Sequence, residues 1–208
     1  MAEGTRYFFF GDSLTLGVGD EQALGWVGRV MRSVRDDAAS TLPATFYNLG
    51  VRGDTGAGIA RRWRGELEAR CPLGVTPRMV FAFGVNDART LYPGGPSLRT
   101  VEDTLEHAQA ILEQARELGP VIMVGPPAVA DEASDTLIEE RSSHLRALCR
   151  ARATSFVETH APTRADARYL PALRAGDGYH PGAVGYELLA EVIGGSDAWR
   201  AWHTASLR

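Results

Sequence analysis

The sequence has few of the residues that build disulfide or metal frameworks. Its 208 residues include only two cysteines, Cys71 and Cys149, which form neither a CxxC pair nor a cluster with other ligand-type residues. Isolated thiols of this kind are typical of a protein from a reducing compartment. We therefore expect ordinary thiols, no disulfide scaffold and no metal site.

Long hydrophobic runs are also missing. The first apolar run, YFFF at residues 7–10, is followed at once by Gly11 and Asp12, and it is too short for the hydrophobic region of a signal peptide. No stretch approaches the roughly 18 apolar residues of a membrane span. The sequence therefore predicts a cytoplasmic protein without a membrane span.

An excess of basic residues is the third absence. There are 22 lysines and arginines against 26 aspartates and glutamates, which gives a formal net charge of −4 and argues against a nucleic-acid binder. The hydrophobic share of 44% is that of an ordinary globular protein. No repeat, linker or low-complexity tract interrupts the chain, so we expect one domain over residues 1–208. The sequence does not define an oligomeric state.

Short apolar runs alternate with segments that have an apolar stripe at helical spacing. The expected strands are 7–10, 44–49, 79–83, 120–124 and 155–158, and the expected helical stripes are 27–34, 59–67, 101–115, 137–152 and 184–192. The strands are continuously apolar, as strands covered on both faces should be. This order predicts a doubly wound parallel sheet with helices on both faces, a three-layer α/β/α sandwich.

Small and chemically active residues follow several of these strands. GDSLT at 11–15 follows the first strand, NLGVRGDT at 48–55 ends the second, GVND at 84–87 follows the third, and DGYHP at 177–181 precedes the last helix. Any one of these residues is more often a turn former or a helix cap than a catalytic group. Because sites in doubly wound sheets form beyond the carboxyl ends of the strands, we expect the four segments to meet.

The last segment carries the most specific signal. Asp177 stands three residues before His180 in a tight turn, close enough to accept the imidazole Nδ1–H and fix the tautomer. Nε2 is then free to take a proton from a serine, and Ser13 is the candidate. Asp12 is interpreted as a partner within its own turn. His160 follows the fifth strand without a carboxylate in the order that a base needs, so we interpret it as structural.

Acyl transfer also requires hydrogen-bond donors for the developing oxyanion. A glycine lets a backbone N–H approach closely, and an asparagine side chain supplies another N–H. Gly53 and Asn86 lie at adjacent strand ends and are the candidate donors. No metal or organic cofactor is needed for such a site.

Together the four segments resemble the SGNH, or GDSL, hydrolase superfamily. GDSL stands at 11–14, and NLGVRGDT, GVND and DGYHP follow in the family's order. The resemblance implies a flavodoxin-like five-stranded sheet and a serine ester hydrolase that works through an acyl-enzyme. The family's nucleophile, acid and base fall on Ser13, Asp177 and His180. Its oxyanion donors fall on the Ser13 N–H, on Gly53 in preference to Gly50, and on Asn86.

The substrate pocket is less constrained by the sequence. We expect it to be lined by residues beside the active segments, namely Asp12, Leu14, Pro126 and Tyr179. The surrounding loops at 15–26, 89–97 and 126–131 are short and lack a long apolar lid, which favours small or medium acyl esters. The alternatives are a flavodoxin-like mononucleotide binder with a phosphate loop after the first strand, a non-catalytic binding protein, and a carbohydrate O-deacetylase of the same superfamily.

Two further features carry weaker expectations. In the run Arg61-Arg62-Trp63-Arg64 we interpret the tryptophan as buried and the arginines as its solvated neighbours. Trp199 and Trp202, three residues apart in the tail, either pack back on the domain or make dimer contacts.

Overall fold

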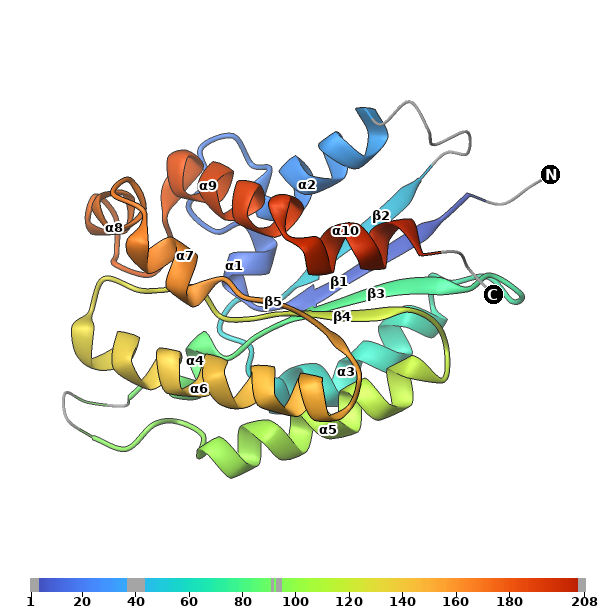
Figure 1. Cartoon of the computed structure of the whole chain (residues 1–208), viewed down its shortest axis with the longest axis horizontal. Helices are drawn as coiled ribbons and strands as arrows, with labels where there is room; N and C mark the ends of the chain where they lie inside the picture. The colour runs from blue at the N-terminus through green and yellow to red at the C-terminus, as the bar shows by residue number, and fades with distance from the viewer. Residues whose placement is uncertain (1–3, 37–43, 91, 93–94, 206–208) are drawn as a thin grey trace.

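Five parallel strands form one sheet in the computed structural model of the chain, which describes residues 4–36, 44–90, 92 and 95–205 (Figure 1). The strands are β1 (Arg6–Gly11), β2 (Thr45–Gly50), β3 (Pro77–Ala82), β4 (Val121–Val124) and β5 (Ser155–Val157). The helices are α1 (Ser13–Leu16), α2 (Gly25–Asp36), α3 (Gly56–Glu68), α4 (Val85–Ala88), α5 (Val101–Arg116), α6 (Glu132–Ala151), α7 (His160–Ala165), α8 (Tyr169–Arg174), α9 (Gly182–Gly195) and α10 (Asp197–Thr204). The spatial order β2-β1-β3-β4-β5 is the flavodoxin-like order, so the predicted fold class is confirmed.

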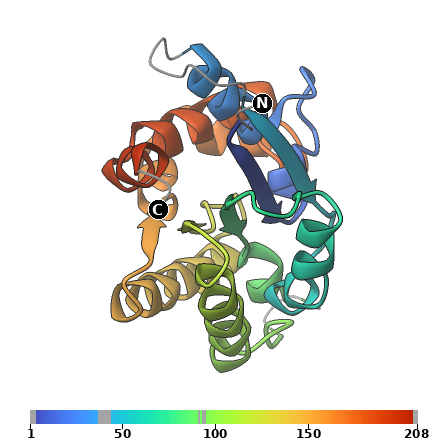
Figure 2. The same ribbon diagram turned by 90° about the vertical axis from the view of Figure 1, so that its right-hand side faces the viewer.

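Successive side chains of the central strand β1 enter two different cores. Tyr7 and Phe9 face the core shared with α2, α9 and α10, whereas Phe8 and Phe10 face the core shared with α3, α5 and α6. Figure 1 shows these two helical layers above and below the sheet, and the view turned by 90° shows the strands between them (Figure 2). None of the helices in the described part of the chain is both long and apolar enough to cross a membrane.

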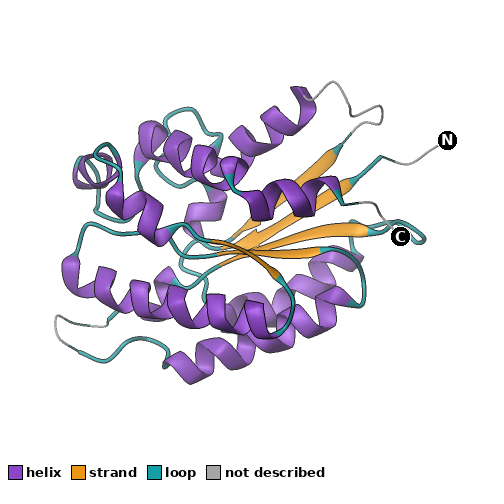
Figure 3. Cartoon of the chain, viewed as in Figure 1, coloured by secondary structure: helices purple, strands orange, loops and turns teal. Residues whose placement is uncertain are grey.

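The three strands that lead to the candidate site end level with one another. Gly11 of β1 is in register with Gly50 of β2 and with Ala82 of β3. The strand order reverses between β1 and β3, whose following segments leave toward opposite faces and open a crevice between them. The short helices and loops that gather at this end of the strands are drawn in Figure 3.

Several helices differ from their expected bounds. Helix α6 begins at Glu132, five residues before the expected stripe, because the Asp131 side chain accepts the N–H of Ser134 at 2.8 Å and caps the helix there. Val184, expected on the buried stripe of the last helix, is 58% exposed in the first turn of α9. Helices α1, α4, α7, α8 and α10 have no counterpart among the expected stripes, since segments of four to eight residues are too short to show a clear period.

The tail forms helix α10, which packs back on the core that it shares with α2 and α9. The Trp199 ring stacks on Phe9 with ring centroids 6.4 Å apart, and Trp202 meets Tyr7 edge-on at 6.1 Å. Arg78 Nη1 donates to the Trp202 carbonyl oxygen at 2.5 Å. Of the two possibilities for the tail, packing on the same chain is therefore the one that the structure shows.

Replacing Trp199 by alanine is expected to lower the free energy of unfolding by about 3–5 kcal/mol, because it removes a large buried ring from the core. Denaturant unfolding followed by circular dichroism measures this change. Leu73→Ala is the control, since Leu73 is fully exposed and its loss should change stability by less than about 0.5 kcal/mol. A Trp199 variant as stable as that control would contradict the buried position of α10.

Candidate active site

Ser13 is the first residue of helix α1, directly after the end of β1. Asp12 caps this helix through Oδ1, which accepts the N–H of Leu14 at 2.9 Å. An N–H in the first turn has no acceptor within its own helix, and none of the described residues accepts the N–H of Ser13. The local structure thus provides a serine hydroxyl and an uncommitted N–H on the same residue.

Asp177 and His180 form a tight turn before α9. One carboxylate oxygen of Asp177, Oδ1, accepts the backbone N–H groups of Tyr179 and His180 at 3.0 and 2.9 Å. The other, Oδ2, lies 2.7 Å from Nδ1 of the His180 ring. Burial alone would raise the pKa of Asp177, but these hydrogen bonds from His180 and Tyr179 lower it to about 2. Asp177 is therefore ionised at neutral pH.

This arrangement defines how His180 faces Ser13. An ionised carboxylate only accepts hydrogen bonds, so Nδ1 of His180 carries the ring proton of the neutral imidazole. Nε2 is then an acceptor, and it lies 2.9 Å from Oγ of Ser13. The structure thus brings Ser13, His180 and Asp177 into one hydrogen-bonded chain across 167 residues of sequence.

The Asp177–His180 turn is anchored to three other parts of the fold. The Gly178 carbonyl accepts the N–H of Ala130 at 2.9 Å, and the Gly178 N–H donates to Leu173 at 3.0 Å. Glu21 Oε2 accepts the N–H of Ala183 at 2.7 Å, just after the turn. Because these bonds hold the turn from several sides, the imidazole has little freedom to leave Ser13.

The two candidate glycines have different environments. The Gly50 N–H donates to Asn48 Oδ1 at 3.1 Å, and a Cβ at this position would lie 2.3 Å from the backbone nitrogen of Leu16, so Gly50 is needed for close packing. Gly53 has a φ of +77°, which favours glycine, and open space around it. Its N–H has no acceptor among the described residues, and it borders the same cavity as Ser13.

Asn86, in helix α4, projects its side-chain amide toward the same place. Nδ2 donates to the Asp54 carbonyl oxygen at 2.9 Å and to Oδ2 of Asp12 at 3.3 Å. Both amide hydrogens therefore already have acceptors within the protein. An oxyanion bound here would take the hydrogen that now forms the longer contact, the one to Asp12.

These groups surround a cavity of about 250 Å³. It is lined by Ser13, Leu14, Arg52, Gly53, Val85, Asn86, Arg89, Asp177, Tyr179 and His180. The expectation for the pocket needs correction at Asp12 and Pro126, which are buried beneath the cavity and border a separate void of about 20 Å³. Asp12 turns inward because its carboxylate caps α1.

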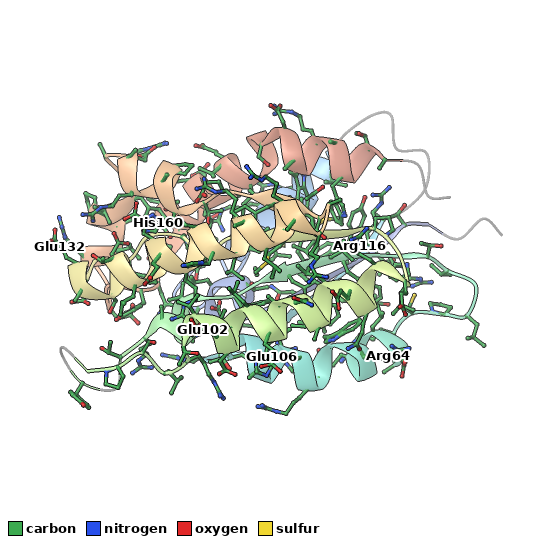
Figure 4. The ribbon with its side chains drawn as sticks, turned by 60° about the horizontal axis from the view of Figure 1, so that its bottom comes forward. Arg64, Glu102, Glu106, Arg116, Glu132 and His160 are labelled. Carbon is green, nitrogen blue, oxygen red and sulfur yellow. The ribbon has the colours of Figure 1, made fainter. Side chains whose placement is uncertain are left out.

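His160 belongs to a second Asp–His pair away from this cavity, beside helix α6 (Figure 4). Its Nε2 lies 3.1 Å from Oδ1 of Asp135, and both residues are buried. Oδ1 of Asp135 also accepts the N–H of Val129 at 2.9 Å. No serine hydroxyl within the described part of the chain contacts this imidazole. Through Asp135 and Val129, His160 instead stabilises the loop after β4. Nowhere among the described residues do three histidine, cysteine or acidic side chains cluster as a metal site would require.

Arg62 is a residue of the site that sequence reasoning missed. Its Nε lies 2.7 Å from Asp54 Oδ2, and its Nη2 donates to the Gly11 carbonyl oxygen at 2.9 Å. One guanidinium thus ties the loop that carries Gly53 to the end of β1. The expectation of a solvated side chain is wrong for Arg62, although Arg64, two residues later on the other side of α3, fits it. The sequence signal for this ion pair is the position of Asp54, eight residues or about two helical turns before Arg62.

Asp87 also has a positioning role that its motif did not reveal. Its two carboxylate oxygens accept the N–H of Gly56 at 3.2 and 3.1 Å, at the start of helix α3. Oδ1 additionally accepts the Thr104 hydroxyl at 3.3 Å. Burial raises the pKa of Asp87 above its usual value, against the effect of the hydrogen bond from Gly56. Asp87 thereby connects the segment after β3 to the loop after β2.

A hydrogen-bonded Ser–His–Asp chain at the carboxyl edge of a doubly wound sheet is an arrangement that serine hydrolases use. Residues 9–188 match the GDSL-like lipase/acylhydrolase family, and the chain belongs to that family. The superfamily resemblance of the four segments is thus confirmed, and the protein is a carboxylic ester hydrolase.

Solved structures with the same fold include an acetylxylan esterase from Geobacillus stearothermophilus. It is 19% identical, the match covers 95% of this chain and 97% of that chain, and the TM-score is 0.74. A lipolytic protein of the G-D-S-L family from Veillonella parvula is 20% identical over 91% of this chain and 96% of that chain, with a TM-score of 0.70. A search of curated protein sequences found no significant match.

The buried carboxyl group of Asp12 predicts a pH dependence of stability. Burial raises its pKa from 3.8 to about 7, and the Asp87 carboxylate adds to this while the Leu14 N–H opposes it. Between these two pH values the folded chain holds a proton that the unfolded chain has lost, so the free energy of unfolding should fall as pH rises through this window. In urea unfolding measured from pH 4 to 7, the free energy of unfolding should fall less steeply with pH for Asp12→Asn than for the wild type.

Asp131→Asn is the matched control for this measurement. Asp131 also caps a helix, but hydrogen bonds from Ser134 lower its pKa, so its contribution is lost only at pH values below its ordinary one. The Asp131 variant should therefore keep the wild-type slope between pH 4 and 7. Equal slopes for Asp12→Asn and the wild type would show that Asp12 is ionised in the folded chain.

Arg62→Gln should reduce kcat for p-nitrophenyl acetate by about 10- to 100-fold, because small displacements of a catalytic group have effects of this size. The substitution releases the loop of Gly53 from the end of β1. Arg64→Gln is the control, since Arg64 pairs with Glu68 on the outer face of α3 (Figure 4), contacts no other acidic residue that the structure describes, and should keep wild-type activity. If the two variants have the same kcat, the tie through Arg62 does not position the loop.

Proposed function

We propose that the protein is a serine esterase in which Ser13 is the nucleophile and His180 the general base. The observation that carries this proposal is the 2.9 Å contact between Ser13 Oγ and His180 Nε2 at the crevice of the sheet. Ser13 Oγ attacks the ester carbonyl carbon while its proton passes to His180 Nε2. The ionised Asp177 stabilises the imidazolium that results.

The negative charge on the carbonyl oxygen is received by three donors. These are the backbone N–H groups of Ser13 and Gly53 and the side-chain amide of Asn86. To donate, Asn86 exchanges its 3.3 Å contact with Asp12 for the oxyanion. The pKa of Asp12, raised by burial to about 7, weakens this competing acceptor, because a carboxyl group that holds a proton attracts the amide less than a carboxylate does.

The same residues carry out the departure of the alcohol and the hydrolysis of the acyl-enzyme. His180 gives its proton to the oxygen of the leaving alcohol, the bond from that oxygen to the carbonyl carbon breaks, and the acyl group stays on Ser13. A water molecule next attacks the acyl-enzyme, with His180 again accepting the proton. The bond between the carbonyl carbon and Ser13 Oγ then breaks, His180 returns its proton to Oγ, and the acid is released.

The size of the hollows supports a small acyl group. The cavity beside Ser13, of about 250 Å³, lies below the range of roughly 300–1,000 Å³ that holds drug-sized ligands. A second hollow of about 510 Å³ shares Asp177 and His180 with it and extends over Gly19, Ala172 and Pro181. We assign the acyl group to the first hollow and the alcohol to the second. Carbohydrate O-deacetylation is the second candidate, because a structure with this fold is an acetylxylan esterase.

The geometry does not favour the mononucleotide alternative. Amides after β1 are already bonded, since the N–H groups of Leu16, Gly17 and Val18 donate to the carbonyl oxygens of Asp12 and Ser13. The Thr15 hydroxyl is 1% exposed. This segment therefore offers a phosphate few donors.

We also propose that residues 1–208 are one catalytic domain, because both hydrophobic cores pack against the same sheet. We place it in the cytoplasm, where the two isolated cysteines of the sequence would stay reduced.

Ser13→Ala and His180→Ala should each reduce kcat for p-nitrophenyl esters by about 10⁴-fold or more, because each removes a member of the nucleophile–base pair. Asn86→Ala should cost about 10²–10³ in kcat, the usual effect of one oxyanion donor. A panel of esters from acetate to palmitate measures these values and should show the highest kcat/KM for the shortest acyl groups.

Ser33→Ala serves as the control for the nucleophile. Ser33 is exposed on helix α2, where its hydroxyl donates to the Val30 carbonyl oxygen, and its loss should leave the kinetics unchanged. Hydrolysis that persists in both the Ser13 and the His180 variants would refute the proposed mechanism.

A further inference from the structure

Two arginine side chains of the cavity have no role in the mechanism. Arg52 and Arg89 both line it and are both exposed. Neither guanidinium has an ion pair or hydrogen bond with the described residues, whereas Arg62 and Arg29 nearby are held by Asp54 and Asp20. Two cations at the entrance of a site this small are therefore available to a substrate.

Their backbones are fixed on either flank of the oxyanion donors. Arg52 immediately precedes Gly53, in a turn that Val51 joins to the end of β1 through its N–H bond to the Gly11 carbonyl, 3.0 Å long. Arg89 lies one helical turn after Asn86, at the end of α4, and its carbonyl accepts the N–H of Leu98 at 2.7 Å. Both side chains therefore start from well-anchored positions beside the scissile carbonyl.

The acidic groups of the same region are already engaged. Asp177 is the one acidic residue of the cavity lining, and its carboxylate is bonded to His180 and to its own turn. Asp54, behind Gly53, is paired with Arg62, and Asp12 is buried beneath the cavity. The entrance thus has a local excess of positive charge, although the whole chain has a net charge of −4.

We propose that Arg52 and Arg89 select esters that carry an ionised carboxylate within a few bonds of the scissile carbonyl. This inference rests on the proposed esterase function and adds the charge of the substrate to it. A guanidinium presents paired N–H donors that match the two oxygens of a carboxylate. A carboxylate is also a small anion, so an acyl group that carries one fits into the cavity of about 250 Å³ that we assign to the acyl side.

The test compares matched pairs of anionic and neutral esters. For a carboxylate on the alcohol side, the pair is para-acetoxybenzoate and para-acetoxybenzamide. For a carboxylate on the acyl side, it is p-nitrophenyl hydrogen glutarate and p-nitrophenyl butyrate. The quantity measured is the ratio of kcat/KM for the anionic ester to kcat/KM for the neutral one. Its change between variants is free of the intrinsic reactivity of the esters.

We expect Arg52→Gln combined with Arg89→Gln to lower this ratio by about five- to fifty-fold in at least one pair. This is the size of effect expected when two hydrogen-bonded ion pairs at the surface are lost. Activity on the neutral ester should stay within about three-fold of wild type. Lysine at both positions should retain part of the preference, because the charge remains. Raising the salt concentration from about 0.05 to 0.5 M should reduce the wild-type preference through screening.

Arg61→Gln is the matched control, since Arg61 is exposed on α3 and lies outside the cavity lining. It should leave the ratio unchanged. The inference is overturned if the variant that combines Arg52→Gln with Arg89→Gln keeps the wild-type ratio in both pairs. It is also overturned if the activity of this variant falls equally on anionic and neutral esters, because the arginines would then stabilise the oxyanion or the fold. Ser13-dependent hydrolysis of the neutral esters would meanwhile leave the proposed function standing, and its absence would refute that function instead.

Discussion

The level ending of three neighbouring parallel strands is the constraint on which the site depends. Because Gly11, Gly50 and Ala82 are in register, the segments that follow them emerge side by side, although 71 positions separate the first from the last (82 − 11). In the proposed site each segment contributes one part: a hydroxyl after β1, a backbone N–H after β2 and an amide side chain after β3. The fold therefore supplies proximity, and the loops need only supply chemistry.

Acidic and basic side chains outside the cavity lining keep these segments together. Asp12 receives the Asn86 amide, Asp87 receives the N–H of Gly56, and Arg62 joins Asp54 to the Gly11 carbonyl. Each contact crosses from one strand-end segment to another, so a shift of any segment would leave a buried polar group without its partner. The cost of burying carboxylates here is visible in the raised pKa values of Asp12 and Asp87, which burial causes. The segments that carry the proposed oxyanion donors are thus held together by side chains outside the cavity lining, and only the contact between Asn86 and Asp12 has to open when Asn86 donates.

The sequence predicted the elements that have a repeated pattern and missed the ones that do not. Continuous apolar runs located all five strands, and apolar stripes located the five long helices around the sheet. Helices α1 and α4 are single turns whose starts follow from capping and backbone geometry, and neither leaves a period in the sequence. Among the site residues, Asp177 and His180 could be paired because they are three residues apart. The contact from Arg62 to Gly11 spans 51 residues and depends on the packing of α3 beside β1, which no local pattern encodes. The role of Asp12 within its own turn could be predicted because its partner Leu14 is two residues away, whereas its absence from the cavity lining could not.

The proposed nucleophile and its proposed base are 167 residues apart in the sequence. Ser13 lies in the first helix, whereas His180 lies just before α9, whose residues complete the core over β1. During synthesis, the serine is therefore an ordinary, weakly nucleophilic hydroxyl until the residues up to the end of α9 have left the ribosome and α9 has docked. A truncated or partly folded chain can hold an intact GDSL segment and still be unable to form an acyl-enzyme. Reactivity of Ser13 toward an acylating probe thus reports the completion of folding as much as the presence of the motif.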